Sequence, residues 1–441
     1  MFTAGCNLPP VPSEEEEEEE DYPWSTIAAP SVLHEAAYHG STEDILSILS
    51  RGSVAIDHVG PGGYTPLMFA ARKCQSSAVR VLLNKGANLS IVGDDSFTAL
   101  HISAHEGDLA TTKMLVEAGA DLEEAISTGA TPLYLAASYG RWEVVRALIA
   151  AGANPGRCIP SGGSTPLHAA AEKGHVRAVR ELLRANVNPS LIRDGDVVPL
   201  DLATRKGYSG VVRELIRQVG IEGCGGPSAG QTALRMAAVY KHMDIMVILM
   251  DAGVVDAGSA LVYAAQCGDE GPVKFLLQRR KMQEQKVHKR ERETMGEVSY
   301  VNSRDSLLGQ TPLLASIMSF SPRIGRILID AGADTTSAVQ FTVGIGEGFF
   351  NETPLALISS LRRDTFVKEE LRKIEATRRL LLQVDAVRAV SWLWPGNIPA
   401  IAPAAKVSVW TEATSSSLTV MMPTMRRSIK SRGVLSAALH R

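Results

Sequence analysis

The sequence predicts an all-α solenoid of about ten helix–turn–helix repeats joined by short β-turn fingers. Three observations lead to this fold class. One short motif recurs along the 441 residues, its first copies are almost evenly spaced, and the residues that end a second helix follow most copies at a fixed distance. A stack of similar supersecondary units leaves this periodic signature in a sequence.

The recurring motif reads T-P-L-x-x-A-A in its clearest form. The first six intervals between copies are 33 or 34 residues, whereas the last three are 27, 52 and 42. In most units a glycine stands 21 positions after the motif start. Because this distance is constant, the variation in the interval between copies falls in the surface connection after the glycine. The copies start at Ser31, Thr65, Thr98, Thr131, Thr165, Val198, Thr232, Ser259, Thr311 and Thr353.

The unit that starts at Thr131 shows why the motif folds as two short helices. The Thr131 hydroxyl caps the first helix, and Pro132 loses no hydrogen bond because amides of the first turn lack a partner. Gly140 supplies a left-handed residue that ends this helix, and Gly152 ends the second. Helices this short are marginal alone, so each unit buries its apolar residues against neighbours. The predicted core of the unit is Leu133, Ala136, Ala137, Val144, Val145, Leu148 and Ile149.

Four units close with Gly-Ala-Asn or Gly-Ala-Asp, at Gly86, Gly119, Gly152 and Gly332. With the T-P-L-H-x-A opening and the period of 33, they resemble the ankyrin repeat over about residues 31–385. The resemblance implies a superhelix whose concave face, made by fingers and first helices, binds other proteins. It also implies that the histidine of the opening motif ties each repeat to its neighbour by hydrogen bonds. These histidines are His34, His101 and His168, and the seventh to ninth units depart most from the family pattern.

Charge and composition divide the chain into three parts. Residues 1–30 carry eight acidic residues and no Lys or Arg, and we expect this segment to be disordered. Residues 31–388 form the predicted array, with a charged insertion at about 278–308 and a finger insertion at about 335–352. Residues 389–441 form a basic tail rich in Pro and Ser, which we also expect to be disordered.

The composition favours an intracellular protein with neither membrane nor nucleic acid as a partner. The formal net charge is −3, and the five cysteines are far apart and never form a C-x-x-C pair. A secretory signal and a run of about 20 apolar residues are both missing. We expect a cytoplasmic protein. A nuclear location is the alternative if the seven Lys or Arg of residues 278–293 act as a localisation signal instead of extending a solvated helix.

The sequence shows no catalytic, cofactor or metal constellation. His101 and His105 lie four residues apart on one helix, but the glutamate of a zinc protease motif and a third ligand are missing. The glycines around Gly346 lack the lysine of a phosphate-binding loop, and an elongated finger is the simpler interpretation. We predict no enzyme activity, no cofactor and no metal. An enzyme with an unrecognised site is the alternative from a different functional class.

The favoured function is a non-catalytic scaffold, a monomeric array that binds a protein partner through its concave face. The alternative within this class is a substrate adaptor of a larger assembly such as a ubiquitin ligase, with residues 389–441 as the docking element.

The seventh and eighth residues after each motif start lie at the exposed end of the first helix, so they form a row across the array, with the finger tips beside it. Tyr and Arg are common interface anchors, and the bases favour an acidic partner. Trp142, at the start of a second helix, is assigned to the core instead. The candidate binding residues are Arg72, Lys73, Asp94, Asp95, Phe97, His105, Tyr139, Lys173, Arg205, Lys206 and Tyr240.

Overall fold

The computed structural model describes residues 31–286, 300–304, 309–336, 339–342, 349–352, 354 and 368–393. The acidic segment 1–30, part of each insertion and the tail from 394 onward lie outside these residues, so their predicted character stays a prediction. The predicted start of the tail at 389 falls inside a helix, because helix α20 runs from Lys368 to Leu393.

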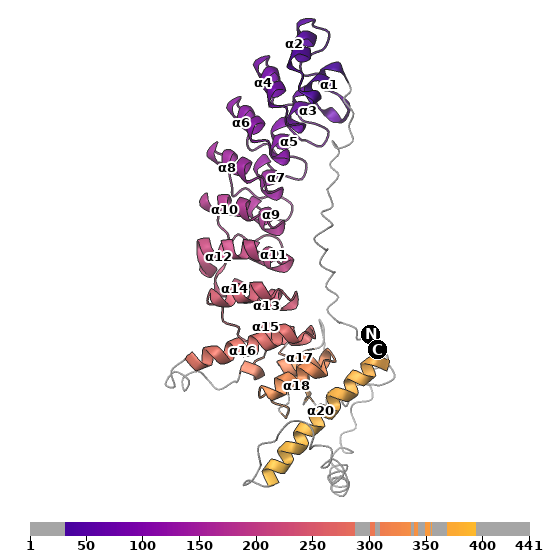
Figure 1. The fold of residues 1–441 in the computed structure, drawn as a ribbon, viewed down its shortest axis with the longest axis vertical. Helices are drawn as coiled ribbons and strands as arrows, with labels where there is room; N and C mark the ends of the chain where they lie inside the picture. Colours follow the sequence, from indigo (N-terminus) through magenta and orange to yellow (C-terminus); the bar gives the residue numbers. More distant parts are fainter. Residues whose placement is uncertain are drawn as a thin grey trace. The chain divides into compact units, whose positions relative to one another are not determined.

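Pairs of antiparallel helices follow one another along the described chain (Figure 1). The first helices of the pairs are α1 (Val32–His39), α3 (Pro66–Arg72), α5 (Ala99–Glu106), α7 (Pro132–Ser138), α9 (Pro166–Glu172), α11 (Pro199–Lys206), α13 (Gly226–Val239), α15 (Ser259–Gln266) and α17 (Pro312–Met318). The second helices are α2 (Thr42–Ser50), α4 (Ser76–Asn84), α6 (Leu109–Glu117), α8 (Trp142–Ala150), α10 (Val176–Arg184), α12 (Ser209–Gly223), α14 (Met243–Asp251), α16 (Glu270–Lys286) and α18 (Pro322–Asp330).

The helix pairs stack in two layers. Each first helix contacts the next first helix from α1 to α17, and the second helices do the same from α2 to α14 and between α16 and α18. Figure 1 shows the odd-numbered helices of the stack on one side and the even-numbered helices on the other. The predicted all-α repeat solenoid is therefore confirmed, while the count of about ten repeats stays a prediction.

The opening motif caps the first helix as predicted. The Tyr134 N–H donates to Oγ1 of Thr131 at 3.2 Å, and four other motif threonines cap their helices in the same way. Thr232 does not, because α13 begins six residues earlier at Gly226, so the predicted helix start there is wrong. Ala233 stands where other units have proline, and a helix can extend backwards through alanine but not through proline.

The core follows the small residues of the motif. Ala136 and Ala137 are fully buried, and their small size lets neighbouring first helices approach closely. Leu133 is 1% exposed, which confirms its predicted place in the core. The buried side chains form one continuous cluster from Leu33 to Leu381.

The stack continues through the irregular units. α16 extends to Lys286, so the start of the charged stretch is helical, as the solvated-extension interpretation predicted. A short 3₁₀ turn, η3 (Tyr300–Asn302), returns to the array, and the Tyr300 hydroxyl donates to Oδ2 of Asp256 at 2.6 Å. Asp256 also accepts hydrogen bonds from backbone amides at the start of α15. The hydrogen bond between Tyr300 and Asp256 therefore anchors this part of the insertion to the core of the array.

The last described elements are a hairpin and a long helix. Strands β1 (Val339–Thr342) and β2 (Phe349–Glu352) pair antiparallel, with Val339 opposite Glu352. They lie within the predicted finger insertion. α20 is 26 residues long and buries Ile374, Leu380 and Leu381.

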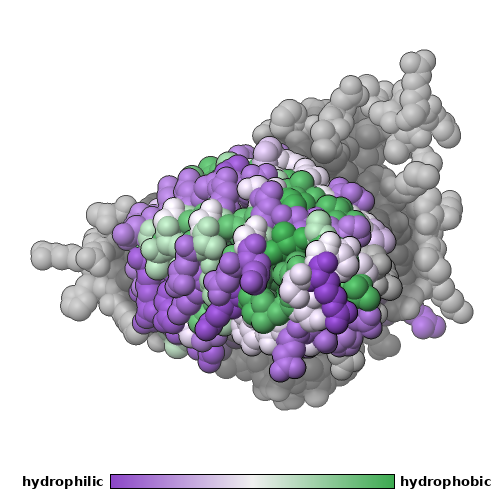
Figure 2. Space-filling view, turned by 90° about the horizontal axis from the view of Figure 1, so that it is seen from above, coloured by the Kyte–Doolittle hydropathy of each residue, from purple (hydrophilic) through white to green (hydrophobic). Residues whose placement is uncertain are grey.

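Helices α1 and α2 form one end of the stack, with a neighbouring repeat on one side only. Figure 2 looks onto this end, where hydrophobic side chains gather at the centre and hydrophilic ones surround them. In these two helices Val32 is 59% exposed and Leu46 is 42% exposed. Terminal repeats of solenoids commonly present a polar outer face, so this end of the array departs from that rule.

Candidate protein-binding surface

The predicted binding residues lie at the ends of the first helices and on the fingers. Lys73, Lys173 and Asp94 are exposed, and the remaining candidates except Phe97 are partly buried. The structure brings the helix-end candidates together as one row, here called the first-helix row. Its members are Arg72, Lys73, His105, Tyr139, Lys173, Arg205, Lys206 and Tyr240, together with Tyr38 and Glu172 at the same helix ends.

Residues of the first-helix row contact one another across repeat boundaries. The Nζ of Lys73 lies 4.8 Å from the ring centroid of Tyr38 in the preceding repeat. The Tyr139 and His105 rings lie 4.2 Å apart, centroid to centroid. Such contacts turn equivalent positions in separate repeats into a continuous surface of cations and aromatic rings.

Two acidic residues, Glu106 and Glu172, lie at these helix ends and belong to the same chain of contacts, and Oε1 of Glu106 lies 3.2 Å from Nδ1 of His105. Glu172 lies 3.9 Å from Nη2 of Arg205 in the next repeat, and its other carboxylate oxygen pairs with Arg193 at 2.9 Å. Arg205 and Lys206 are consecutive bases at the end of α11, so Glu172 offsets only part of the positive charge there. The row is therefore basic on balance.

The three finger candidates have different positions. Asp94 is exposed. Asp95 is partly buried, where it accepts hydrogen bonds from the Phe97 N–H at 3.1 Å and from the hydroxyl of Tyr64 on the preceding finger. Burial and this bond to Asp95 both raise the pKa of Tyr64. Phe97 is 2% exposed and packs against His101, so its predicted place on the surface is wrong. Tyr64, Ala130 and Ser164, which also stand directly before a motif threonine, are buried like Phe97.

The histidines of the opening motif make the predicted ties. The Thr98 N–H donates to Nδ1 of His101 at 3.2 Å, which leaves the proton on Nε2 to donate to the Glu124 carbonyl at 3.1 Å. His34 and His168 reach the Tyr64 and Val197 carbonyls in the same way. Burial lowers the pKa of His101 to about 4. Both ring nitrogens are occupied, so His101 does not form a metal pair with His105.

One set of contacts escaped the sequence analysis. The residue directly after the turn between the two helices reaches back to the preceding repeat. Nε of Arg141 donates to the His105 carbonyl at 2.9 Å, and Nε2 of His175 donates to the Ser138 carbonyl at 2.9 Å. Both side chains lie over a turn glycine of the repeat before, where a Cβ would clash. A base or histidine after the turn glycine is the sequence signal that could have found them.

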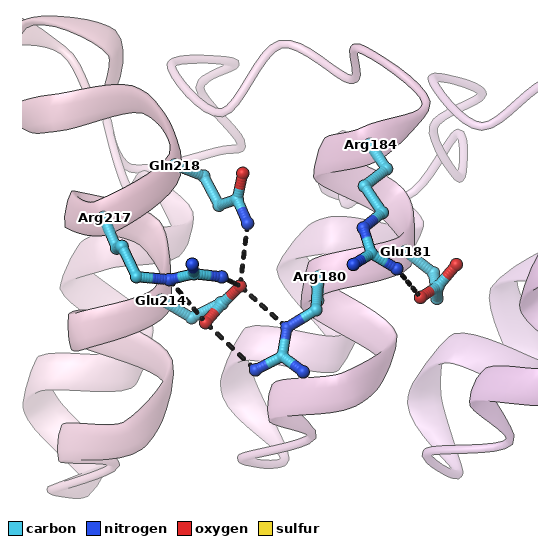
Figure 3. Close-up of polar contacts among 6 residues, drawn as sticks. All are labelled: Arg180, Glu181, Arg184, Glu214, Arg217 and Gln218. Atoms are coloured by element: carbon cyan, nitrogen blue, oxygen red, sulfur yellow. Dashed lines mark hydrogen bonds and ion pairs between the residues drawn. The ribbon is translucent and has the colours of Figure 1, made fainter.

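A buried carboxylate holds two second helices together. Glu214 on α12 accepts hydrogen bonds from Nε and Nη2 of Arg180 on α10 at 2.9 and 3.2 Å, and further bonds from Arg217 and Gln218 (Figure 3). The bond from Arg180 is the main cause that lowers the pKa of Glu214 to about 2, against the opposing effect of burial. Glu214 is therefore an ionised structural residue in the neutral range.

In the part of the chain that the structure describes, no group of three or more His, Cys, Asp and Glu side chains could hold a metal ion. Nor does any described helix combine the length and apolar character needed to cross a membrane.

The chain was compared with known proteins. A family model described as ankyrin repeats in three copies matches residues 28–93, 89–159 and 156–224. No curated protein gives a significant match. Ankyrin repeats are generally protein–protein interaction modules, and proteins built from them are typically non-catalytic scaffolds. With their stacked helix pairs and inter-repeat histidine bonds, residues 28–224 of the chain are ankyrin repeats.

Proposed function

We propose that the array binds a protein partner through the first-helix row and catalyses no reaction. The observation that supports this most is the set of contacts across repeat boundaries, from Lys73 to Tyr38 and from Tyr139 to His105. These contacts restrict long side chains before a partner arrives. A surface that is ordered in advance loses less conformational entropy when it binds.

The chemistry of the row favours a partner with acidic side chains. Lys73, Lys173 and Lys206 stand at equivalent places in three repeats, and aromatic rings lie between them in the stack. Aromatic side chains supply contact area at low entropic loss, while exposed bases speed the approach of an anionic surface. The same proposal includes a monomeric array in the cytoplasm. The adaptor alternative rests on residues 389–441, and no contact of the described residues favours it.

The proposal can be tested with the full chain as bait in a cell lysate and mass-spectrometric identification of the captured proteins. The test variant carries Tyr139→Ala and Lys173→Ala. A matched control carries Leu46→Ala and Lys85→Ala, two exposed residues of the second-helix side. We expect the wild type and the control to retain a partner that the test variant loses.

Equal capture by all three proteins would place the partner away from the first-helix row and overturn this part of the proposal. Circular dichroism of each variant checks that the fold is unchanged. The non-catalytic part would be overturned by a robust activity of the full chain that one polar substitution abolishes.

A further inference from the structure

The second helices carry a second row of bases on the other side of the stack. The fifth residue of every second helix from α4 to α12 is Arg or Lys. These helices contact one another in order, so the five bases form a continuous line, here called the second-helix row. Its members are Arg80, Lys113, Arg146, Arg180 and Arg213. The row ends at apolar residues on both sides, Leu46 on α2 and Val247 on α14.

The charges of this row are available to an anion. Arg80, Lys113 and Arg213 are exposed, and none of the described residues forms an ion pair with them. Arg146 lies over the ring of Trp142, with its guanidinium carbon 5.4 Å from the centroid. Exposed bases without acidic partners keep their full attraction for an external carboxylate, apart from solvent screening.

The fifth base, Arg180, is fixed by the carboxylate beneath it. Glu214 takes two hydrogen bonds from Arg180 and two from Arg217, so one carboxylate is shared by two guanidinium groups (Figure 3). Glu214 is only 5% exposed, whereas Arg217 is exposed. The cluster of these three residues therefore retains one positive charge at the surface.

An aromatic residue stands beside the row. Trp142 packs against the core as predicted but is only partly buried, and a second guanidinium, of Arg177, lies 5.7 Å from its ring centroid. Glu117 and Glu143 are exposed acids of α6 and α8, and neither forms an ion pair with a described residue of the row. Glu181, directly after Arg180, pairs with Arg184 at 2.7 Å. The surface therefore combines a line of bases with a Trp–Arg cluster, which suits an extended acidic peptide.

We propose that the second-helix row is the docking surface of the chain's own acidic segment, the eight residues from Glu14 to Asp21. Consecutive packed helices lie roughly 10 Å apart, and an extended chain advances roughly 3.3 Å per residue. Three residues of an extended segment therefore cover one repeat. Eight acidic residues span roughly 26 Å, close to the length of three repeat steps along the row.

The connection to the array is long enough for this contact. Nine residues, 22–30, separate Asp21 from Ser31, directly before α1, and the ten steps from Asp21 to Ser31 can reach at most roughly 35 Å. α2 pairs with α1 and contacts α4, so Arg80 lies one repeat step from the start of the array. The segment would then run from Arg80 toward Arg180, with Lys113 near its middle. The tether raises the effective concentration of the segment at the row, which favours it over a free acidic peptide.

Lys113 makes the contact measurable, because it is the one residue of the row with a reactive amine. Treatment of the full chain with a carbodiimide joins a carboxylate to an amine that touches it and forms an amide with loss of water. Mass spectrometry then identifies the joined peptides. We expect Lys113 coupled to residues 14–21, with a yield that falls about tenfold between roughly 0.01 M and roughly 1 M salt, where the Debye length shrinks from about 30 to about 3 Å.

Two double variants separate the row from general charge. Arg80→Gln with Arg146→Gln removes the bases that flank Lys113, and we expect the coupled yield to fall about fivefold because two of five charges are lost. Arg323→Gln with Arg372→Gln removes two exposed bases elsewhere, and the yield should not change. Lys113→Arg keeps the charge and should abolish the cross-link, which verifies its identity.

The outcomes against the proposal are also distinct. A yield that is insensitive to salt and to the row variant would overturn it. A mixture of isotopically light and heavy chains that gives light–heavy cross-links would assign the row to a second copy instead. If only an added oligoglutamate peptide couples to Lys113, the row takes an external acidic partner and the chain's own segment is excluded.

Discussion

The Nε2 atom of His101 lies 3.1 Å from the carbonyl oxygen of Glu124, and this bond joins the start of α5 to the finger that precedes α7. The ring is fully buried and neutral, and its Nδ1 accepts a hydrogen bond from the Thr98 N–H. A protonated ring could not accept that bond. The stability of the array should therefore depend on pH through this residue.

The first prediction concerns acid sensitivity. Burial lowers the pKa of His101 from 6.5 to about 4, so below about pH 6.5 the unfolded chain binds a proton that the folded chain excludes. The free energy of unfolding keeps its full value above this pH. It falls by up to about 3 kcal/mol as the pH drops toward about 4. Burial lowers the pKa of His34 and His168 in the same direction.

Urea unfolding followed by circular dichroism at several pH values between about 7 and about 5 measures this effect. We expect His101→Gln to reduce the slope of stability against pH by about 1 kcal/mol per pH unit. The matched control is His39→Gln, at an exposed position of α1. If His101→Gln leaves the slope of stability against pH unchanged, the protonation of His101 does not contribute to the acid sensitivity of the array.

The second prediction concerns Asp201, which replaces the motif histidine in the sixth unit. Its Oδ2 accepts a hydrogen bond from the Val198 N–H, but Oδ1 is buried without a partner. Burial raises the pKa of Asp201 to about 6, so the folded chain holds a proton that the unfolded chain has released between about pH 4 and about pH 6. This contribution to stability is present at low pH and is lost as the pH rises through about 6.

Asp201→Asn should therefore stabilise the array at pH 7 by up to about 3 kcal/mol, because no buried charge has to form. The variant should also lose stability more steeply as the pH falls. The contribution of Asp201 to stability has the opposite pH dependence to that of the histidines, and the substitution removes it. Asp194→Asn, at an exposed finger residue, serves as the control. If both variants unfold at the same urea concentration at pH 7, the ionised Asp201 does not lower the free energy of unfolding.

Contacts made by residues of the opening motif could be predicted from the sequence, whereas contacts made by residues outside the motif were missed. The cap at Thr131 follows from the local sequence, and the tie at His101 was implied by the resemblance to the ankyrin repeat; the structure shows both. The Arg141 bond to the preceding repeat was missed although a base directly after a turn glycine marks it, and the bond from Arg180 to Glu214 joins side chains 34 residues apart, which no local pattern encodes. Phe97 was misplaced because the finger sequence does not reveal which residue turns inward.

The irregular units set a second limit. Tyr300 meets Asp256 across 44 residues, and the charged insertion between them carries no periodic signal. Thr232 resembles a motif start, yet α13 runs through it because the proline that would end such a backward extension is missing. The period predicts the stack, but it does not predict how an insertion rejoins it.

The third prediction concerns the core. Leu133→Ala should destabilise the array by about 2–5 kcal/mol, because Leu133 is 1% exposed and the smaller side chain leaves a cavity between closely packed helices. Leu46→Ala is the control, since Leu46 is 42% exposed and leaves no cavity. Urea midpoints of the full chain measure both changes. A similar small effect of the two substitutions would contradict the packing around α7.

The fourth prediction concerns the turn between the two helices of the second unit. Glycine occupies this turn at Gly40 and Gly140, with positive φ, but the second unit has Cys74 with φ 53°. A non-glycine residue in the left-handed region carries a strain of about 1 kcal/mol. Cys74→Gly should therefore raise the stability of the array by about that amount, because glycine adopts the left-handed conformation without strain and Cys74 is an exposed residue.

Cys74→Ala distinguishes backbone strain from the loss of the side chain. Alanine keeps a Cβ, so it retains the strain, and its stability should stay close to that of the wild type. Gly140→Ala should have the opposite effect to Cys74→Gly, because a Cβ at Gly140 would lie 2.6 Å from Nδ1 of His175 in the next repeat. Thermal unfolding of the three variants at pH 7 checks these relations. Equal stabilisation by Cys74→Gly and Cys74→Ala would assign the gain to removal of the thiol and not to relief of the left-handed backbone.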